Sequence, residues 1–495
     1  MPTIHSSKLQ RLLAFACGTL ITFSLAPFNA WPLALISLAG LHYLLSADKK
    51  QQGFSLGAFF GIGLLLSGAH WIFVSINDYG GTGTPIAVAI TLFFCCGVGF
   101  LAAPFFGFYQ RYLAHTLLGS SLGFAAIFLL SEWFRTWFLT GFPWLLVGYS
   151  QVDGPLASWA PIIGTLGVGL LLAFSAALVS LSVQKRCHWA WLAAPLLLFA
   201  LGPWLNTLDW TQKKSDKAYS VALVQGNTPL EEKWDPAYKD AIMQNYLDDV
   251  EALNGTDIIL LPETALPEYL HRARPWLKSA DKALSLSDSA LITGIIRAEF
   301  GEQDMDIYNT LTTAGMAFGT YDKQKLVPFG EYVPFERWLR KVLDFPMSSF
   351  SRGASEQKPL LAKDLAVQPY ICYEITYPNF VSDSAQHSDL LLTVSNDLWF
   401  GRSIGPLQHL QMARMRALET GRYLLRATNN GVTAVIDHKG KIIKQIPSFE
   451  RGILKSEVYA MQGLTPVMQY GTLPSLIFGF LVLAFSLVRH YLLNR

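Results

Sequence analysis

The second half of the sequence holds a lone cysteine among carboxylates and lysines that follow short apolar runs. Cys372 lies in the stretch QPYICYE, and it is the only cysteine between about residues 206 and 472. A free thiol has a pKa of about 8.5, so a nucleophilic cysteine needs a base or a nearby cation. Buried structural cysteines are also common. Cys372 is therefore either a nucleophile or a packing residue, and its neighbours must decide between the two.

Candidate bases and cations follow other apolar runs of the same region. The run DIILLPET ends in Glu263, and the stretch YDKQKLVPFGEYVP supplies Lys323, Lys325 and Glu331. Another carboxylate, Glu374, comes two residues after the thiol. A carboxylate can take the thiol proton, and a lysine can stabilise both a thiolate and the oxyanion of an acyl intermediate. These residue types predict a nucleophile, a base and a cation, and either lysine could be the cation.

The elements that must position these groups form a layered domain between about residues 217 and 467. Two segments have the apolar spacing of amphipathic helices, 238–254 and 406–426. Short apolar, β-branched runs between them predict strands at 220–227, 257–264, 290–296, 326–329, 368–374, 389–397 and 431–440. Apolar strands separated by helices are typical of an α/β domain whose sheet faces are covered. Catalytic groups of such sheets gather at strand ends. Asn396 and Asp397 are expected to cap or turn the chain after a strand.

The rest of the chain has the composition of a membrane protein. Of the 495 residues, 51% are hydrophobic and only 15% are charged, far below the usual quarter. Eight stretches are near the length of about 20 residues needed to cross a bilayer. They lie at about 10–26, 30–46, 54–74, 85–107, 117–138, 158–184, 188–205 and 472–490. The sequence thus predicts a polytopic α-helical membrane protein of eight spans, with an alternative in which the first two short spans form a re-entrant pair.

Basic residues between the spans predict the orientation. With eight spans, Lys and Arg residues gather on one side, in the loops after the second, fourth and sixth spans and at both ends of the chain. The positive-inside rule places that side, with both termini, in the cytoplasm. The α/β domain then faces outward. A net charge of +2 and the absence of a Gly-rich phosphate loop predict no nucleic-acid partner.

Four motifs resemble one family along the whole chain. They are LPETALP, YDKQKLVPFGEYVPFE, ICYE and SNDLWFGRSIGPLQHLQMARMRALETGRYLLRATNNGVT. They are similar to those of apolipoprotein N-acyltransferases, the bacterial inner-membrane branch of the carbon–nitrogen hydrolase (nitrilase) superfamily. The resemblance implies seven spans at 1–206, a periplasmic nitrilase-like αββα sandwich at 217–467, and a last span at 472–495.

The resemblance also implies a catalytic triad of Glu263, Lys323 and Cys372. The family motif sets the lysine eight positions before the glutamate of the VPFGE turn, which selects Lys323 rather than Lys325. That glutamate, Glu331, is implied as a further required residue that orients the lysine or shares its proton.

Aromatic residues are the implied substrate contacts. Tyr373 follows the nucleophile as in the family. Trp399 and Phe400, with Phe329 and Trp234, resemble the family's substrate-lining and mobile-loop positions. Trp144 lies near an outward span end, where it contacts substrate or belongs to an interfacial aromatic belt. The nearby Glu132 and Arg135 are expected either to form an i,i+3 ion pair or to contact a lipid headgroup.

The implied reaction has two steps and no metal or other cofactor. Cys372 takes an acyl chain from a phospholipid donor as a thioester, and the α-amino group of a diacylglyceryl-apolipoprotein acceptor then takes it as an amide. The protein is expected to be a monomer in the lipid bilayer of the bacterial inner membrane. Two alternatives stay open: a membrane-tethered amidase that uses water as acceptor, and a catalytically inactive binding or transport protein.

Overall fold

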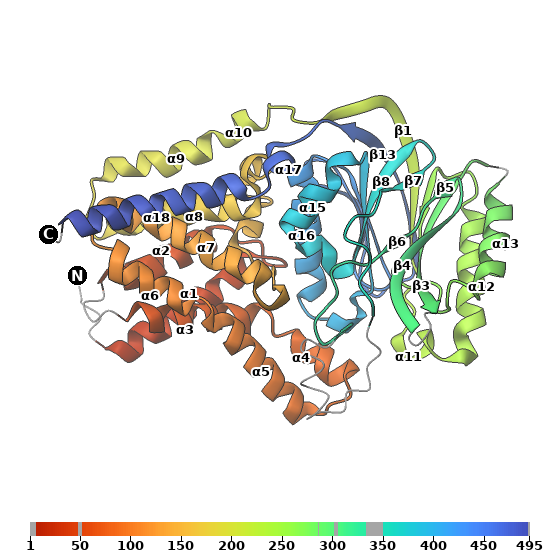
Figure 1. Ribbon diagram of the computed structural model, residues 1–495, viewed down its shortest axis with the longest axis horizontal. Coiled ribbons are helices and arrows are strands. Elements are labelled where there is room, and N and C mark those ends of the chain that lie inside the picture. The colour runs from red at the N-terminus through yellow and green to blue at the C-terminus, as the bar shows by residue number, and fades with distance from the viewer. Residues whose placement is uncertain (1–5, 48–51, 286, 301–304, 333–349, 494–495) are drawn as a thin grey trace. The chain divides into compact units, whose positions relative to one another are not determined.

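The chain divides into two compact units in a computed structural model that describes residues 6–47, 52–285, 287–300, 305–332 and 350–493. A helical unit comprises Met1–Trp210, Trp399–Met415 and Thr465–Arg495, and a sheet unit comprises Thr211–Leu398 and Arg416–Leu464 (Figure 1). The chain therefore passes from the sheet unit into the helical unit at residue 399 and returns at residue 416.

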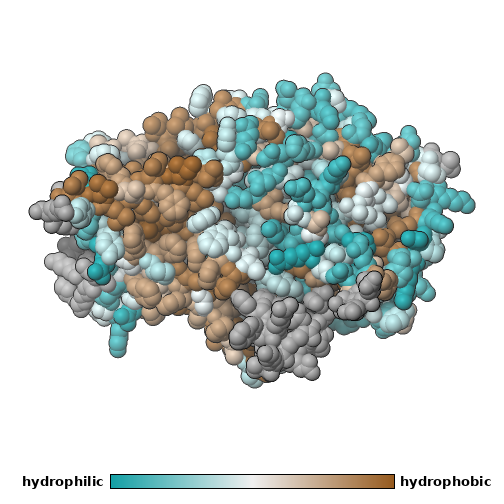
Figure 2. Space-filling model, viewed as in Figure 1, coloured by the Kyte–Doolittle hydropathy of each residue, from teal (hydrophilic) through white to brown (hydrophobic). Residues whose placement is uncertain are grey.

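Helices lie at all eight stretches that were predicted to be spans, and the short helix α17 (Pro466–Tyr470) precedes the last of them. They are α1 (Ser7–Ser24), α2 (Pro32–Ala47), α3 (Gly53–Gly68), α4 (Ile72–Val74), α5 (Thr84–Phe100), α6 (Ala103–Phe108), α7 (Phe124–Trp137), α8 (Ala160–Val183), α9 (Ala193–Ala200), α10 (Gly202–Leu205), α17 (Pro466–Tyr470) and α18 (Leu473–Leu493). Brown, hydrophobic side chains dominate the visible face of this unit in Figure 2. An apolar exterior of this kind suits helices that face lipid.

Length and apolar composition separate these helices into classes. In the described part of the chain, four are long and apolar enough to cross a membrane: Thr84–Leu113, Gly119–Thr140, Ala157–Val183 and Leu473–Leu492. The pair Gly53–Gly68 and Ile72–Tyr79 passes the same test together but is bent by 59°. Pro32–Ser46 and Trp189–Leu205 are shorter apolar helices. The count of eight spans stays a prediction, and three of the basic residues behind its orientation, Lys49, Lys50 and Arg495, lie outside the described residues.

Two sheets form the sheet unit. The first has the strand order β13-β1-β2-β3-β4-β6, and the second has the order β12-β11-β10-β9-β8-β7-β5. Strands of the first sheet are β1 (Gln212–Gln225), β2 (Ile258–Leu260), β3 (Ala290–Phe300), β4 (Met305–Gly315), β6 (Tyr321–Asp322) and β13 (Gly452–Gln462). Those of the second are β5 (Ala317–Phe318), β7 (Leu360–Ala362), β8 (Leu365–Ile371), β9 (Leu390–Ser395), β10 (Leu424–Thr428), β11 (Thr433–Ile436) and β12 (Ile442–Ile446).

The period-two alternation of strand side chains explains how the layers pack. In β1, Val221 and Leu223 belong to a core that also contains residues of the second sheet, such as Leu392 of β9. Their neighbours in β1 point the other way, and Ala222 and Val224 join a separate core with α12 (Pro236–Ala252) and α13 (Arg274–Leu284). On the second sheet, the β8 residue Tyr370 reaches α15 (Pro378–Ser384), where its hydroxyl bonds to the carbonyl oxygen of Val381 at 3.2 Å. The predicted α/β layering, with apolar strands and covered faces, is therefore confirmed.

Several predicted elements are wrong in extent or type. The strand predicted at 368–374 ends at Ile371, so Cys372 and Glu374 lie in a 3₁₀-helix, and the strands predicted at 257–264 and 431–440 extend only over Ile258–Leu260 and Thr433–Ile436. The predicted strand at 326–329 is a turn, because Pro328 has no N–H, Phe329 has a φ of 61°, and Glu331 N–H bonds back to the Val327 carbonyl at 2.9 Å. The predicted helix 406–426 is α16 (Gly405–Thr420), which ends before Gly421, a residue with a φ of 59°. The chain then enters β10, which pairs in parallel with β9.

Candidate active site

Cys372 occupies a sharp turn directly after β8. It has a φ of 54°, in the left-handed region that side-chain-bearing residues rarely adopt, and it begins a short 3₁₀-helix, Cys372–Thr376. The side chain is half-buried against the core between the sheets. A strained, non-glycine residue at a strand end marks a position whose side-chain direction matters.

Glu263 follows β2 and is 7% exposed. Each of its carboxylate oxygens accepts a hydrogen bond: Oε1 from the Asn309 side-chain amide at 2.7 Å, and Oε2 from the backbone N–H of Asn396 at 2.8 Å. The Lys323 Nζ lies 3.7 Å from Oε1. The carboxylate is therefore held in a fixed direction by donors from three different elements.

Lys323 follows β6, is 1% exposed, and lies between two carboxylates. Its Nζ is 2.7 Å from Glu331 Oε1 in addition to the contact with Glu263. Burial alone would lower the pKa of this lysine, but the negative charges of Glu331 and Glu263, with a contribution from Cys372, outweigh burial and raise the pKa. Lys325 is exposed, with Nζ over the ring of Phe380. The geometry thus brings Lys323, and not Lys325, to Glu263.

The electrostatics of the thiol itself favour the neutral form at rest. Burial raises the pKa of Cys372, and the charge of Glu263 raises it further, while Lys323 opposes both. A thiol beside a carboxylate and an ammonium can lose its proton to the first and be stabilised as a thiolate by the second. This arrangement is suited to nucleophilic attack on a carbonyl carbon.

Glu374 joins the cysteine turn to the segment that carries the lysine. This fully buried carboxylate accepts from the backbone N–H of Ile371 at 2.8 Å, and its other oxygen accepts from Gln324 N–H at 2.6 Å and Lys325 N–H at 3.1 Å. The Tyr321 hydroxyl donates at 3.0 Å to the same oxygen as the Ile371 N–H. Burial raises the pKa of Glu374 to about 7, against the opposing effect of these backbone donors.

Sequence reasoning left out four residues that the structure brings to this site. Asn309 bonds to Glu263, and the three consecutive residues Ser395, Asn396 and Asp397 each contact the site or one another. Asp397 does begin a turn, as expected, but it is also 1% exposed and ion-paired. The sequence offered a signal for the segment 395–397, because these polar residues end an apolar run as Glu263 does. Nothing in the sequence marks Asn309 as a site residue.

The predicted substrate residues of the sheet unit differ in exposure. Phe329 is 55% exposed in the turn before Glu331, and Trp234 is 49% exposed after the short helix α11 (Leu230–Lys233). Tyr373 is 8% exposed and its ring makes an edge contact with Tyr377. Their role as substrate contacts stays a prediction.

The other three predicted contacts belong to the helical unit. Trp144 is 1% exposed, and its Nε1–H donates to Gln408 Oε1 at 2.7 Å. Phe400 packs against Trp71 and Trp144, with ring centroids 4.7 and 5.8 Å apart. Trp399 is 42% exposed, and its carbonyl oxygen accepts from the Ser75 hydroxyl at 2.7 Å. These contacts fix the segment 399–415 within the helical unit, and the predicted contact with substrate stays untested.

Two family models match the chain. The model described as the apolipoprotein N-acyltransferase N-terminal domain matches residues 17–178, and the carbon-nitrogen hydrolase model matches residues 220–462. An apolipoprotein N-acyltransferase of Pseudomonas paraeruginosa is 45% identical over 94% of this chain and 92% of its own length. The chain belongs to the apolipoprotein N-acyltransferase family.

One further relative extends over nearly the whole chain, and a solved structure resembles about half of it. The apolipoprotein N-acyltransferase of Pseudomonas putida is 45% identical over 96% of each chain. A solved amidase from Nesterenkonia sp. is 19% identical, with a TM-score of 0.36 over 49% of this chain and 90% of that chain. The carbon-nitrogen hydrolase match covers the two sheets and the helices between their strands, so the sheet unit is a nitrilase-like α/β domain.

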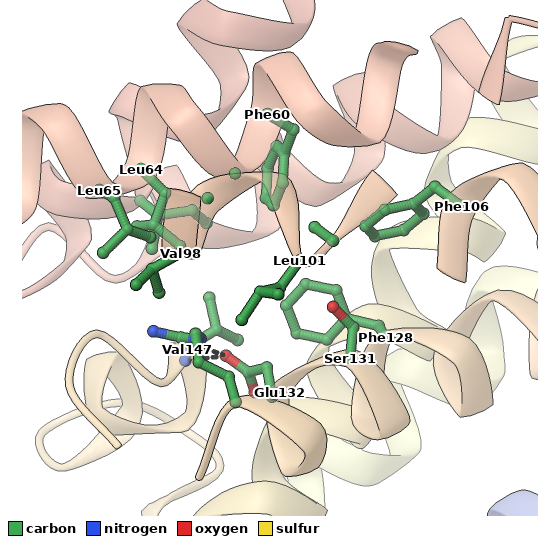
Figure 3. Close-up of a pocket in the computed structure, with 15 residues that line it drawn as sticks. Phe60, Leu64, Leu65, Val98, Leu101, Phe106, Phe128, Ser131, Glu132 and Val147 are labelled. Atoms are coloured by element: carbon green, nitrogen blue, oxygen red, sulfur yellow. Dashed lines mark hydrogen bonds and ion pairs between the residues drawn. The ribbon is translucent and has the colours of Figure 1, made fainter. Parts of the chain in front are cut away.

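Within the helical unit, a cavity lies between α3, α5 and α7 (Figure 3). Its volume is about 30 Å³ and its walls are mostly apolar, with Glu132 and Arg135 among the lining residues. Glu132 and Arg135 form the expected i,i+3 ion pair at 3.7 Å. Arg135 also donates to the carbonyl oxygens of Trp144 and Leu145, and Glu132 accepts from Val147 N–H at 2.7 Å. The pair therefore fixes the 144–147 loop.

Proposed function

We propose that this protein N-acylates the N-terminal diacylglyceryl-cysteine of apolipoproteins, with a phospholipid as acyl donor and a thioester on Cys372 as the intermediate. Membership of the family supports the activity, and one observation supports the assignment of residues. Glu263, Lys323 and Glu331 form a connected set of charges around a lysine that is 1% exposed, and the charges of Glu263 and Lys323 act directly on the Cys372 thiol.

In the first step, Glu263 takes the thiol proton and the Cys372 sulfur attacks the ester carbonyl carbon of the phospholipid. The Lys323 ammonium stabilises the tetrahedral oxyanion. When the carbon–oxygen bond breaks, Glu263 returns the proton to the leaving oxygen, and lysophospholipid departs. Glu331 keeps the ammonium in place, because its carboxylate binds the same Nζ at 2.7 Å.

In the second step, the free α-amino group of the acceptor attacks the thioester carbon. Glu263 takes a proton from the attacking nitrogen, and Lys323 again stabilises the oxyanion. The carbon–sulfur bond then breaks to release the amide, and Glu263 gives its proton to the leaving sulfur, which restores the Cys372 thiol. Water competes with the amine for the thioester, so apolar residues must limit its access. We assign this shielding and the binding of lipid chains to Tyr373, Trp399, Phe400, Phe329, Trp234 and Trp144.

The placement that we propose follows from the lipid nature of both substrates. Eight spans, in segments 1–206 and 472–495, would hold the catalytic domain at 217–467 on the periplasmic face of the bacterial inner membrane. The basic residues of the cytoplasmic loops support this orientation, and the long apolar helices support the membrane location. One chain carries the full triad, so we propose a monomer.

Intact mass spectrometry of the purified protein, incubated with phospholipid and no acceptor, tests this function. We expect a mass gain of one acyl chain that hydroxylamine removes. The adduct should be absent in C372A and present in C187A, which removes a thiol of the helical unit. Steady release of fatty acid without an adduct would favour an amidase-like hydrolase, and neither adduct nor turnover would favour an inactive binding protein.

A further inference from the structure

The hydroxyl of Ser395 lies between the thiol and a buried carboxylate. Its Oγ is 3.5 Å from Cys372 Sγ, within hydrogen-bond range for sulfur, and it also donates to Asp397 Oδ1. Ser395 is the last residue of β9 and is completely buried. A serine hydroxyl has one proton to donate. It can therefore serve the carboxylate or the sulfur at any moment, but not both.

The two possible acceptors differ in strength according to the charge on the sulfur. A neutral thiol is a weak acceptor, so the carboxylate of Asp397 takes the Ser395 proton while Cys372 is protonated. A thiolate carries a full charge, and hydrogen bonds to charged groups are roughly twice as strong as neutral ones. The preferred acceptor of the hydroxyl thus changes when the thiol loses its proton.

Arg426 keeps Asp397 paired when the Ser395 hydroxyl turns to the sulfur. Its NH2 group donates to Asp397 Oδ2 at 2.7 Å, and both side chains are completely buried. Gly431 leaves room for this carboxylate, because a Cβ there would lie 2.2 Å from Oδ2. The guanidinium partly neutralises the carboxylate, so Asp397 retains a strong partner when the Ser395 hydroxyl turns away.

We propose that Ser395 is a positioning residue whose hydroxyl donates a hydrogen bond to the Cys372 thiolate whenever that thiolate exists. Asp397, paired with Arg426, holds the hydroxyl next to the sulfur while the thiol is neutral. No bond to hydrogen breaks at Ser395, because only the acceptor of its proton changes. The other charged groups that act on the sulfur are Glu263 and Lys323.

This inference rests on the proposed function, and it adds to both chemical steps. The thiolate is the nucleophile of the first step and the leaving group of the second. A donor that binds the thiolate and releases the neutral thioester sulfur favours attack in one step and departure in the other. Loss of the hydroxyl should therefore slow acylation of Cys372 and transfer to the amine.

The test measures the pH dependence of Cys372 alkylation by iodoacetamide in the full-length protein. Mass spectrometry of the peptide that contains Cys372 separates its signal from those of the other four cysteines. Because only the thiolate reacts, the midpoint of the profile reports how readily the proton leaves. We expect S395A to raise the midpoint by about one pH unit and to slow alkylation about tenfold at a pH below it.

Matched variants separate the hydroxyl from its shape. Threonine and valine have the same shape, but only threonine carries a hydroxyl. The alkylation profile of S395T should therefore match that of the wild type, and the profile of S395V should match that of S395A. The control S388A removes another buried hydroxyl of the sheet unit, which donates to the Ala385 carbonyl at 2.8 Å, and should leave the profile unchanged.

Overlapping profiles for S395T and S395V would overturn the proposal and leave Ser395 as a partner of Asp397 alone. The outcome is independent of the acyl-transfer function, since alkylation requires no lipid. If the wild type forms the acyl adduct and these profiles overlap, only the role of Ser395 fails. If the wild type forms no adduct while the profiles differ, the proposed function fails and the hydrogen bond to the thiolate stands.

Discussion

Replacing Glu331 by Gln removes one of the two carboxylates beside the Lys323 ammonium and keeps the shape of the side chain. Oε1 of Glu331 accepts from Lys323, and Oε2 accepts from the backbone N–H of Val327 at 2.8 Å. A glutamine offers only one oxygen, so either orientation of its amide places an NH₂ group against one of these two donors. The less costly orientation keeps the oxygen on Lys323 and leaves the Val327 N–H unpaired.

The expected loss follows from these two changes. An unsatisfied donor costs about 1–3 kcal/mol, and an uncharged acceptor on Lys323 costs about 1 kcal/mol relative to a carboxylate. The unpaired N–H lowers the stability of the resting enzyme and of the transition state alike, so only the weaker acceptor on Lys323 bears on the rate, and we expect acyl-enzyme formation to slow about five- to tenfold in E331Q. Glu331 is the main charge that holds the pKa of Lys323 up against burial, so E331Q should also lower that pKa.

A time course of the hydroxylamine-sensitive acyl adduct, followed by intact mass spectrometry, measures this rate. The control is E268Q, which alters another lysine–carboxylate pair of similar length in the same unit. Lys239 lies 2.8 Å from Glu268 but is 35% exposed, so the pair is worth only about 0–1 kcal/mol. An E331Q rate within threefold of the wild-type rate would refute the dependence of Lys323 on Glu331.

Three further predictions follow from buried contacts. Burial raises the pKa of Glu374 from 4.5 to about 7, so its contribution to stability is fully present below about pH 4.5 and is lost as the pH rises through about 7. E374Q should remove this part of the pH dependence of the melting temperature. D397N leaves the buried guanidinium of Arg426 without its charged partner and should destabilise the protein by about 3–5 kcal/mol, as measured by thermal unfolding. G294A places a Cβ 2.3 Å from the Thr264 nitrogen and should slow acyl-enzyme formation about tenfold.

Each of these results has a contrary outcome. Parallel pH profiles of E374Q and the wild type would show that Glu374 does not titrate near neutral pH in the folded protein. A D397N variant as stable as the wild type would show that Arg426 finds another acceptor. For G294A, unchanged acyl-enzyme formation would mean that the segment after β2 relaxes without moving Glu263.

The sequence was sufficient to predict the α/β domain, because the pattern of apolar runs depends on burial at each position. The turn at 326–329 was not predictable from apolar character, since Pro328 and the positive φ of Phe329 override it. Likewise, the helix that ends at Thr420 was predicted too long. The pairing of β10 with β9 depends on contacts between residues far apart in the sequence, and helical periodicity does not record them.

The chemical types at the site were predictable, and their connections were not. The residues alone left Lys323 and Lys325 as equal candidates, and only the family motif or the burial of Lys323 distinguishes them. The hydrogen bonds by which Glu374 joins the cysteine turn to the lysine segment come from the backbone N–H groups of residues 324 and 325, and such bonds have no sequence signature. Asp397 was missed because short polar residues after a strand usually cap or turn the chain, and Ser395 was missed because it lies inside the predicted strand.

The passage of residues 399–415 into the helical unit has a consequence for gene architecture. No single continuous segment of the gene encodes the sheet unit alone, since Thr211–Leu398 and Arg416–Leu464 are interrupted by residues whose contacts lie elsewhere. Recombination that exchanges one continuous block would carry Phe400 and Gln408 away from Trp71 and Trp144. We therefore expect functional chimeras between family members only when the 399–415 block is taken from the same parent as the helical unit.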